Sequence, residues 1–188
     1  MLSEPGSAPP PSLEEVESRM RPGALSRTGF LPPGERLRDV LDDDARALDE
    51  LGVPARTLAG RLEALIRLAA LDPLGWVRLE GRLEVECDLR PCAVEGAFEA
   101  RIEPRLGYQV CPWSWDVERP HACRPDRVYA YSDLDWTVRN LHSGEEMNGP
   151  GLIVHLIREH GFFEGPGSPF RVDPRALARV LELAPQGG

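Results

Sequence analysis

The sequence predicts an α+β fold, because a helical region, an alternating region and a second helical region follow one another. Leucine and valine recur at helical spacing over 34–71, apolar and charged residues alternate over 77–89, and helix signals return after residue 150. Helices and strands that occur in separate blocks are typical of α+β architecture rather than of a doubly wound sheet. We expect an N-terminal helical hairpin, an antiparallel β-meander of about four to five strands, and two C-terminal helices.

The composition divides the chain into a tail and one domain. Residues 1–24 are rich in proline and serine and offer little to bury, which predicts a disordered tail, with a short helix over 13–20 as the one element that it offers. Residues 25–188 suffice for a single α+β domain. The start of the chain lacks the apolar stretch of a secretory signal, and no run approaches the roughly 18 apolar residues of a membrane helix. We therefore expect a cytoplasmic protein with reduced thiols.

The helical hairpin is expected to consist of a helix over 34–51 and a second one that runs to about residue 71. Gly52 suits the end of the first helix, and Pro54 suits the first turn of the second. The link between them is short, which predicts that the two helices run antiparallel.

The alternation over 77–89 is unbroken, and this predicts one long strand that bends at Gly81. A loop over 90–96 should then lead into a partner strand over 97–103, forming an antiparallel hairpin. Further strand candidates are 108–111, 127–132 and 135–140, followed by a turn at Ser143-Gly144. The closing helices are expected over 150–160 and after the N-cap signal Asp173-Pro174.

Charge and composition exclude several classes of function. All 22 basic residues are arginine, so the chain has no lysine for a Schiff base, a pyridoxal-phosphate anchor or a P-loop. The net charge of −9 disfavours nucleic-acid binding, because an acidic chain gains nothing from counterion release. We expect a protein partner, with no nucleic acid and no membrane.

All four cysteines and all four histidines lie after residue 86. Structural zinc sites draw on such residues. The best predicted quartet is Cys92, Cys111, His121 and Cys123, with Cys87 as a substitute for one of the cysteines. The alternative is four unligated thiols, because Cys87 shares the apolar face of its strand and a free cysteine behaves there as a small hydrophobe. The cofactor thus stays unknown, with a structural zinc as the candidate.

His155 and His160 lie five residues apart on the expected helix. At 100° per residue their directions differ by about 140°, which predicts that one metal cannot take both from a regular helix. We expect His160 to be a structural imidazole near the helix C-terminus, where its charged form is favoured, and His155 to face the other way with Glu159.

Aromatic residues concentrate in the second half of the chain. Trp113, Trp115, Tyr131 and Trp136 are candidates for a protein interface, and core packing is the alternative for at least two of the aromatics.

One stretch resembles a known family. It contains Gly96-Ala97-Phe98, Ile102-Glu103-Pro104, Tyr108 and Pro112. These residues are loosely similar to the second and third strands of ubiquitin-conjugating-like domains, which also share the order of helix, strand meander and helices. No cysteine lies just before the 150–160 helix, so the resemblance implies a catalytically inert binding version of that fold.

No complete catalytic constellation or cofactor fingerprint is present, so we expect a small, non-catalytic protein-interaction module. The rival hypothesis is an enzyme, either a metal-assisted hydrolase or a thiol enzyme. It would use Cys111, Cys123 and His121, with His155 and Glu159 as further candidates.

Overall fold

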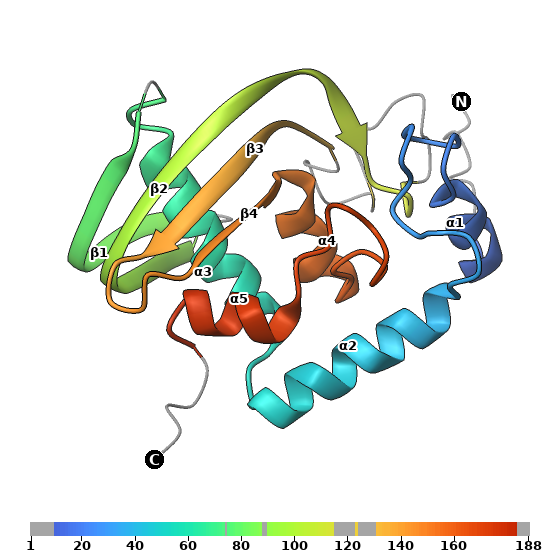
Figure 1. The fold of residues 1–188 in the computed structure, drawn as a ribbon, viewed down its shortest axis with the longest axis horizontal. Helices are drawn as coiled ribbons and strands as arrows, with labels where there is room; N and C mark the ends of the chain where they lie inside the picture. Colours follow the sequence, from blue (N-terminus) through green and yellow to red (C-terminus); the bar gives the residue numbers. More distant parts are fainter. Residues whose placement is uncertain (1–9, 74, 88–89, 115–122, 124–130, 184–188) are drawn as a thin grey trace, which may run out of the picture.

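The computed structural model in Figure 1 describes residues 10–73, 75–87, 90–114, 123 and 131–183. Within these ranges it contains five helices and one four-stranded antiparallel sheet in the order β1-β2-β3-β4. Helices precede and follow the strands, which confirms the α+β fold. The elements are α1 Leu13–Arg19, α2 Leu37–Leu51, α3 Ala55–Ala69, β1 Val77–Cys87, β2 Arg90–Val110, β3 Tyr131–Asn140, β4 Glu146–Pro150, α4 Leu152–His160 and α5 Pro174–Val180.

The first hairpin confirms the long alternating strand and extends its partner. β1 pairs with β2 in continuous register from Val77 opposite Ala100 to Cys87 opposite Arg90, and Gly81 adopts a φ of 83°. The predicted loop over 90–96 is instead the first part of β2, because the pairing continues through it. β2 also includes the two separate strand candidates over 97–103 and up to Val110, joined through an irregularity in the pairing with β3.

The meander continues through β3 to β4, and β4 is a strand that the sequence did not predict. β3 includes the predicted strand over 135–140, whereas 127–130 lie outside the described residues. β4 follows the turn at Ser143-Gly144, but its last three residues are Asn, Gly and Pro, which are unusual in a strand. A Cβ on Gly149 would lie 2.9 Å from the ring of Trp136, so glycine leaves room for the indole.

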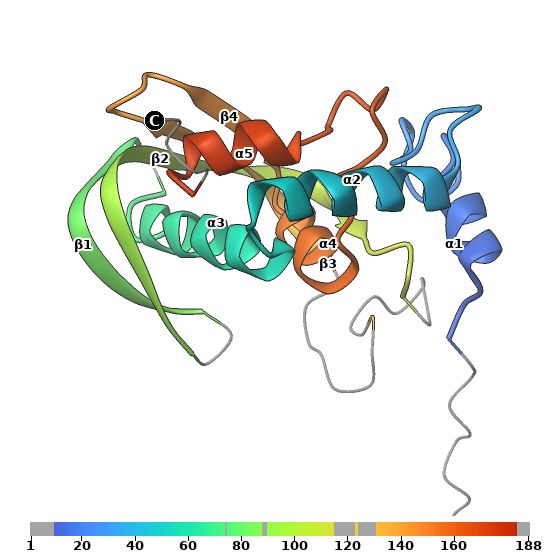
Figure 2. The same cartoon turned by 90° about the horizontal axis from the view of Figure 1, so that it is seen from below.

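Helices cover one face of the sheet. α3 packs against β1 and β2, whereas α4 and α5 pack against β3 (Figure 2). The buried side chains alternate along the strands, and Phe98, Ala100, Trp136 and Val138 are at most 1% exposed. This face and the helices above it form the core, so α4 is held in a fixed position relative to the end of β2.

The two helices of the expected hairpin follow each other through a short link. Gly52 ends α2 with a φ of 66°, as its position in the sequence predicts. α3 packs against β1, β2 and α4, whereas α2 packs against α5. The two helices therefore have different main partners.

The structure differs from the expected disordered tail over residues 10–24. α1 begins with a reciprocal capping box between Ser12 and Glu15, and its side is anchored by Val16 and Met20, which are 1% and 0% exposed. These two apolar residues, together with the 2.8 Å hydrogen bond that the amide of Leu37 donates to Glu17, dock this segment on the domain. Residues 1–9 lie outside the described ranges. Among the helices of those ranges, none has the length and apolar character needed to cross a membrane.

Candidate metal site

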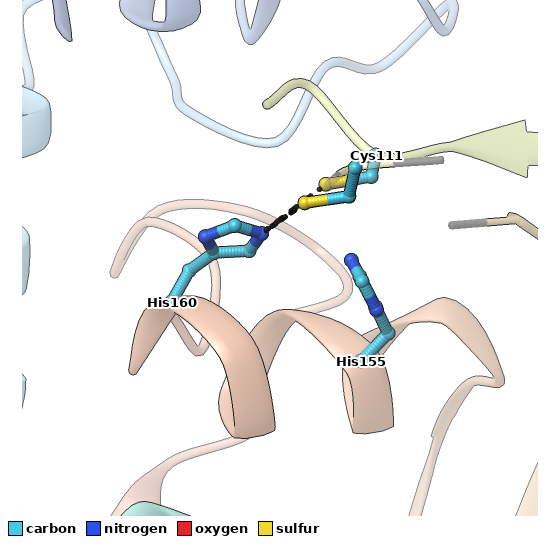
Figure 3. Close-up of side chains that lie close together, drawn as sticks. Cys111, His155 and His160 are labelled. Atoms are coloured by element: carbon cyan, nitrogen blue, oxygen red, sulfur yellow. Dashed lines mark hydrogen bonds between the residues drawn. The ribbon is translucent and has the colours of Figure 1, made fainter. Parts of the chain in front are cut away.

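Two thiols and two imidazoles converge beside α4. The sulfur atoms of Cys111 and Cys123 and one ring nitrogen each of His155 and His160 all lie within 4.8 Å of one another. His160 Nε2 is 3.4 Å from Cys111 Sγ and 3.0 Å from Cys123 Sγ. Figure 3 shows both imidazoles projecting from the helix toward Cys111. A pair of cysteines and a pair of histidines that are at least 32 positions apart in the sequence thus form one group.

Cys111 is positioned by the turn that follows β2. The amide of Ser114 donates to the carbonyl of Cys111 at 2.9 Å, which closes the turn. The guanidinium of Arg19, from α1, donates to the carbonyl oxygens of Pro112 and Ser114 at 3.1 and 2.7 Å. The N-terminal helix therefore braces the segment that presents the first thiol.

Helix α4 presents the two imidazoles from a rigid position. Its apolar side is fully packed, with Leu152, Ile153, Leu156 and Ile157 at most 1% exposed. Arg158 forms a 2.8 Å ion pair with Glu63 of α3, which links the two helices. Gly161 ends α4 in the left-handed conformation, so His160 is the last helical residue.

The expectation that one metal cannot take both histidines is wrong. Their ring centroids are only 5.4 Å apart, although the residues are five positions apart on one helix. Each residue points about 70° to one side of their mean direction, and two long side chains that lean inward meet above the helix surface. The argument from direction alone neglected the length and rotation of the imidazole arm.

Electrostatics favours one thiolate in this group. The thiol of Cys111 and the two imidazoles stabilise the charged form of Cys123, and they lower its pKa to about 3 although burial opposes this. Burial raises the pKa of Cys111, as does the neighbouring Cys123. The pair thus shares one negative charge in the absence of a metal, and a divalent cation would stabilise the second thiolate as well.

Two further observations suit a bound cation. The Nε2 atom of His155 is buried and has no hydrogen-bond partner among the described residues, so a polar ligand atom lies ready inside the group. The indole of Trp113 stacks on His160 with ring centroids 4.0 Å apart and an angle of 5° between the planes. Trp113 therefore covers the outer side of this imidazole and holds its orientation.

The spacing of the four ligand atoms fits zinc. With Zn–S bonds near 2.3 Å and Zn–N bonds near 2.0 Å, tetrahedral geometry places ligand atoms about 3.3–3.8 Å apart. The observed separations reach this range with small side-chain movements. Two thiolates and two neutral imidazoles are also a frequent ligand set of structural zinc sites.

The predicted quartet shares two residues with this group, Cys111 and Cys123. Cys92 lies near the start of β2, opposite Val85 of β1, and the long strand separates it from Cys111 (Figure 1). Cys87, the proposed substitute, lies at the end of β1 in the same hairpin, and its sulfur is 3.8 Å from the carbonyl oxygen of Gly60. It does not belong to the group of ligand atoms beside α4. His121 lies outside the described residues.

The predicted interface residues have different locations. Trp136 is 1% exposed and its indole donates to the carbonyl of Pro150 at 3.0 Å, so it belongs to the core. Trp113 is half-buried and packs on His160 and on Phe162. Trp115 and the side chain of Tyr131 lie outside the described part of the structure.

The sequence did contain a signal for the histidine pair. Structural zinc sites commonly present their histidines as H-x3–5-H, and His155 and His160 are separated by four residues. The prediction from the angle between the two helix positions excluded the pair in spite of this spacing.

The comparisons with known proteins give no match from which a role for this site could be taken. No protein-family model, curated protein or solved structure matches this chain.

Proposed function

We propose that the chain binds one zinc ion through Cys111, Cys123, His155 and His160, and that this metal has a structural role. The observation that carries the proposal is the convergence of four ligand atoms within 4.8 Å. Four protein ligands fill a tetrahedral shell and leave no position for a water molecule or substrate, which is typical of structural zinc. The metal would fasten the segment after β2 to α4.

A closed metal shell also supports a non-catalytic role. Both sulfur atoms belong to buried residues, because Cys111 and Cys123 are 0% and 3% exposed. We therefore propose that the protein is an accessory or regulatory module that acts by binding another protein, with the zinc maintaining the shape of the domain. The net charge of −9 favours a partner with a basic surface.

The test is the metal content of the purified, untagged protein, measured by inductively coupled plasma mass spectrometry together with thiol titration. We expect about one zinc per chain, with two of the four thiols protected until a chelator is added. Absence of zinc from protein refolded with zinc would contradict the proposal.

A thiol enzyme is the second candidate, and the ionisation of Cys123 favours it. A thiol with a lowered pKa, 3.0 Å from an imidazole nitrogen, is the arrangement of a cysteine nucleophile with its base. The two candidates differ in the protein as purified, before any chelator is added. An enzyme would be purified without zinc and alkylated rapidly at Cys123, whereas a structural site would hold zinc and resist alkylation.

A further inference from the structure

Strand β1 lies at one edge of the sheet, and its outer edge has no partner strand within the described ranges (Figure 1). The sequence along it is unusual, because it is complementary to itself when read in the opposite direction about Gly81. The segment is Val77-Arg78-Leu79-Glu80-Gly81-Arg82-Leu83-Glu84-Val85. An edge of this kind is a template for pairing with another strand.

The charged side chains of this segment all point to the open face. Arg78, Glu80, Arg82 and Glu84 have side-chain exposures of 64%, 55%, 67% and 66%. Along the strand they form the pairs Arg78–Glu80 and Arg82–Glu84. All four side chains are therefore more than half exposed to solvent, although each already has one partner on its own strand.

An antiparallel copy of β1, related by a two-fold axis at Gly81, supplies those charges. In this register Arg78 lies opposite Glu84 of the second copy, and Glu80 lies opposite Arg82 of the second copy. Directly opposite charges stabilise antiparallel pairs. On the other face valine meets valine and leucine meets leucine, so that Val77, Leu83 and Val85, which are only partly buried, gain apolar cover.

Neighbouring registers lack this complementarity. A two-fold axis at Glu80 places Arg78 opposite Arg82, and an axis at Arg82 places Glu80 opposite Glu84. Moving one strand by a single residue along the other places charged side chains opposite apolar ones. The charge pattern therefore selects one register and discourages pairing with unrelated strands.

We propose that two copies of this chain associate through their β1 strands about Gly81. The two four-stranded sheets then form one continuous sheet of eight strands, with the helices of both copies on the same face. The contact is a symmetric one in which both copies use the same surface, as in most two-fold dimers. A single strand pair buries less surface than the roughly 1,200 Å² of a stable interface, so the dimer is expected to be weak and concentration-dependent.

The experiment is sedimentation equilibrium of the full chain from micromolar to millimolar concentration. We expect the wild-type protein to dimerise, and we expect Glu84→Arg and Arg78→Glu each to weaken the dimer at least tenfold, because each places like charges opposite one another twice. Asp43→Arg changes the charge by the same amount as Glu84→Arg, at an exposed position on α2, and serves as the control that should still dimerise.

Mixing the two β1 variants gives the decisive result. In a mixed pair Arg78 of one copy meets Glu84 of the other, and the two introduced residues also have opposite charges, so every contact is complementary again. We expect the mixture to form heterodimers where each variant alone is monomeric. A wild-type chain that stays monomeric, a dimer that both reversals leave intact, or a mixture that stays monomeric would overturn the proposal. Circular dichroism of each variant checks that the fold is retained.

Discussion

The molecule contains two pairs of neighbouring cysteines with opposite properties. Cys111 and Cys123 lie beside two imidazoles, at the end of β2 and next to α4. Cys87 and Cys92 lie in the β1–β2 hairpin, and the metal-ligand group among the described residues does not include them. All four are free thiols. The difference between the pairs therefore lies in their surroundings and not in their oxidation state.

The surroundings decide which thiol ionises. Burial, followed by the neighbouring Cys92, raises the pKa of Cys87, and this thiol then behaves as a small apolar side chain. In the other pair the Cys111 thiol and the imidazoles lower the pKa of Cys123 to about 3, against the effect of burial. The proximity of two cysteines thus does not distinguish the candidate metal site, whereas the neighbouring imidazoles and the stabilised thiolate do.

The largest difference between the two cysteine pairs is expected in how their substitution changes metal content and stability. Cys123→Ser and His160→Ala should each abolish stoichiometric zinc binding and reduce the free energy of unfolding by about 4 kcal/mol or more, because metal loss is among the most destabilising changes. Cys92→Ser is the matched control, and it should retain zinc and lose about 1 kcal/mol or less. Metal analysis and urea unfolding measure both effects. Equal zinc loss in Cys92→Ser would abolish the distinction between the pairs.

Thiol reactivity should separate the pairs once zinc is removed. At pH 6, in the chelated native protein, we expect Cys123 to react with iodoacetamide more than about tenfold faster than Cys87, because only the former is a thiolate at that pH. Peptide mapping by mass spectrometry gives the rate at each cysteine. If Cys87 reacts as fast as Cys123, the assignment of the thiolate to the cluster is incorrect.

The brace from α1 should have a moderate effect that is confined to the metal site. Arg19→Ala removes the donor to the carbonyls of Pro112 and Ser114, a loss of about 2 kcal/mol for a charged hydrogen-bond donor. We expect faster zinc transfer to a chromogenic chelator and unchanged Cys87 reactivity. Arg46→Ala, at an exposed position on α2, is the control. Identical transfer rates in both variants would show that α1 does not support the site.

The smallest effect is expected at the indole that covers His160. Trp113→Phe retains an aromatic ring but reduces the stacking area, so we expect a loss of about 1 kcal/mol and a modest rise in the zinc dissociation constant. Zinc binding should also change the fluorescence of the wild-type protein through Trp113, and this change should disappear in the variant. A fluorescence response that persists unchanged would place its source elsewhere.

The fold could be predicted from the sequence where periodicity was strong. The alternation of β1, the cap residues Gly52 and Asp173, and the turn at Gly144 each coincide with an observed feature. The start of β2, over 90–96, was predicted as a loop, because local propensity does not include the pairing with β1 that holds it extended. α1 coincides with the short helix that the sequence offered over 13–20, whereas the proline-rich composition around it did not indicate that this helix is buried against the domain.

The metal site could be predicted only in part. Cys111 and Cys123 were identified from residue type, but their separation of twelve positions gives no short motif. The position of Cys111 and Cys123 beside α4 depends on tertiary packing across β2 and β3, which a single sequence does not reveal. The H-x4-H spacing of His155 and His160 was available, and it would have completed the set.

The most direct test of the central claim is X-ray absorption spectroscopy at the zinc edge of the zinc-loaded, untagged protein. The account predicts two sulfur ligands near 2.3 Å and two nitrogen ligands near 2.0 Å, with no oxygen ligand. A shell of three or four sulfur atoms, a shell with bound water, or failure of the protein to take up zinc would contradict it.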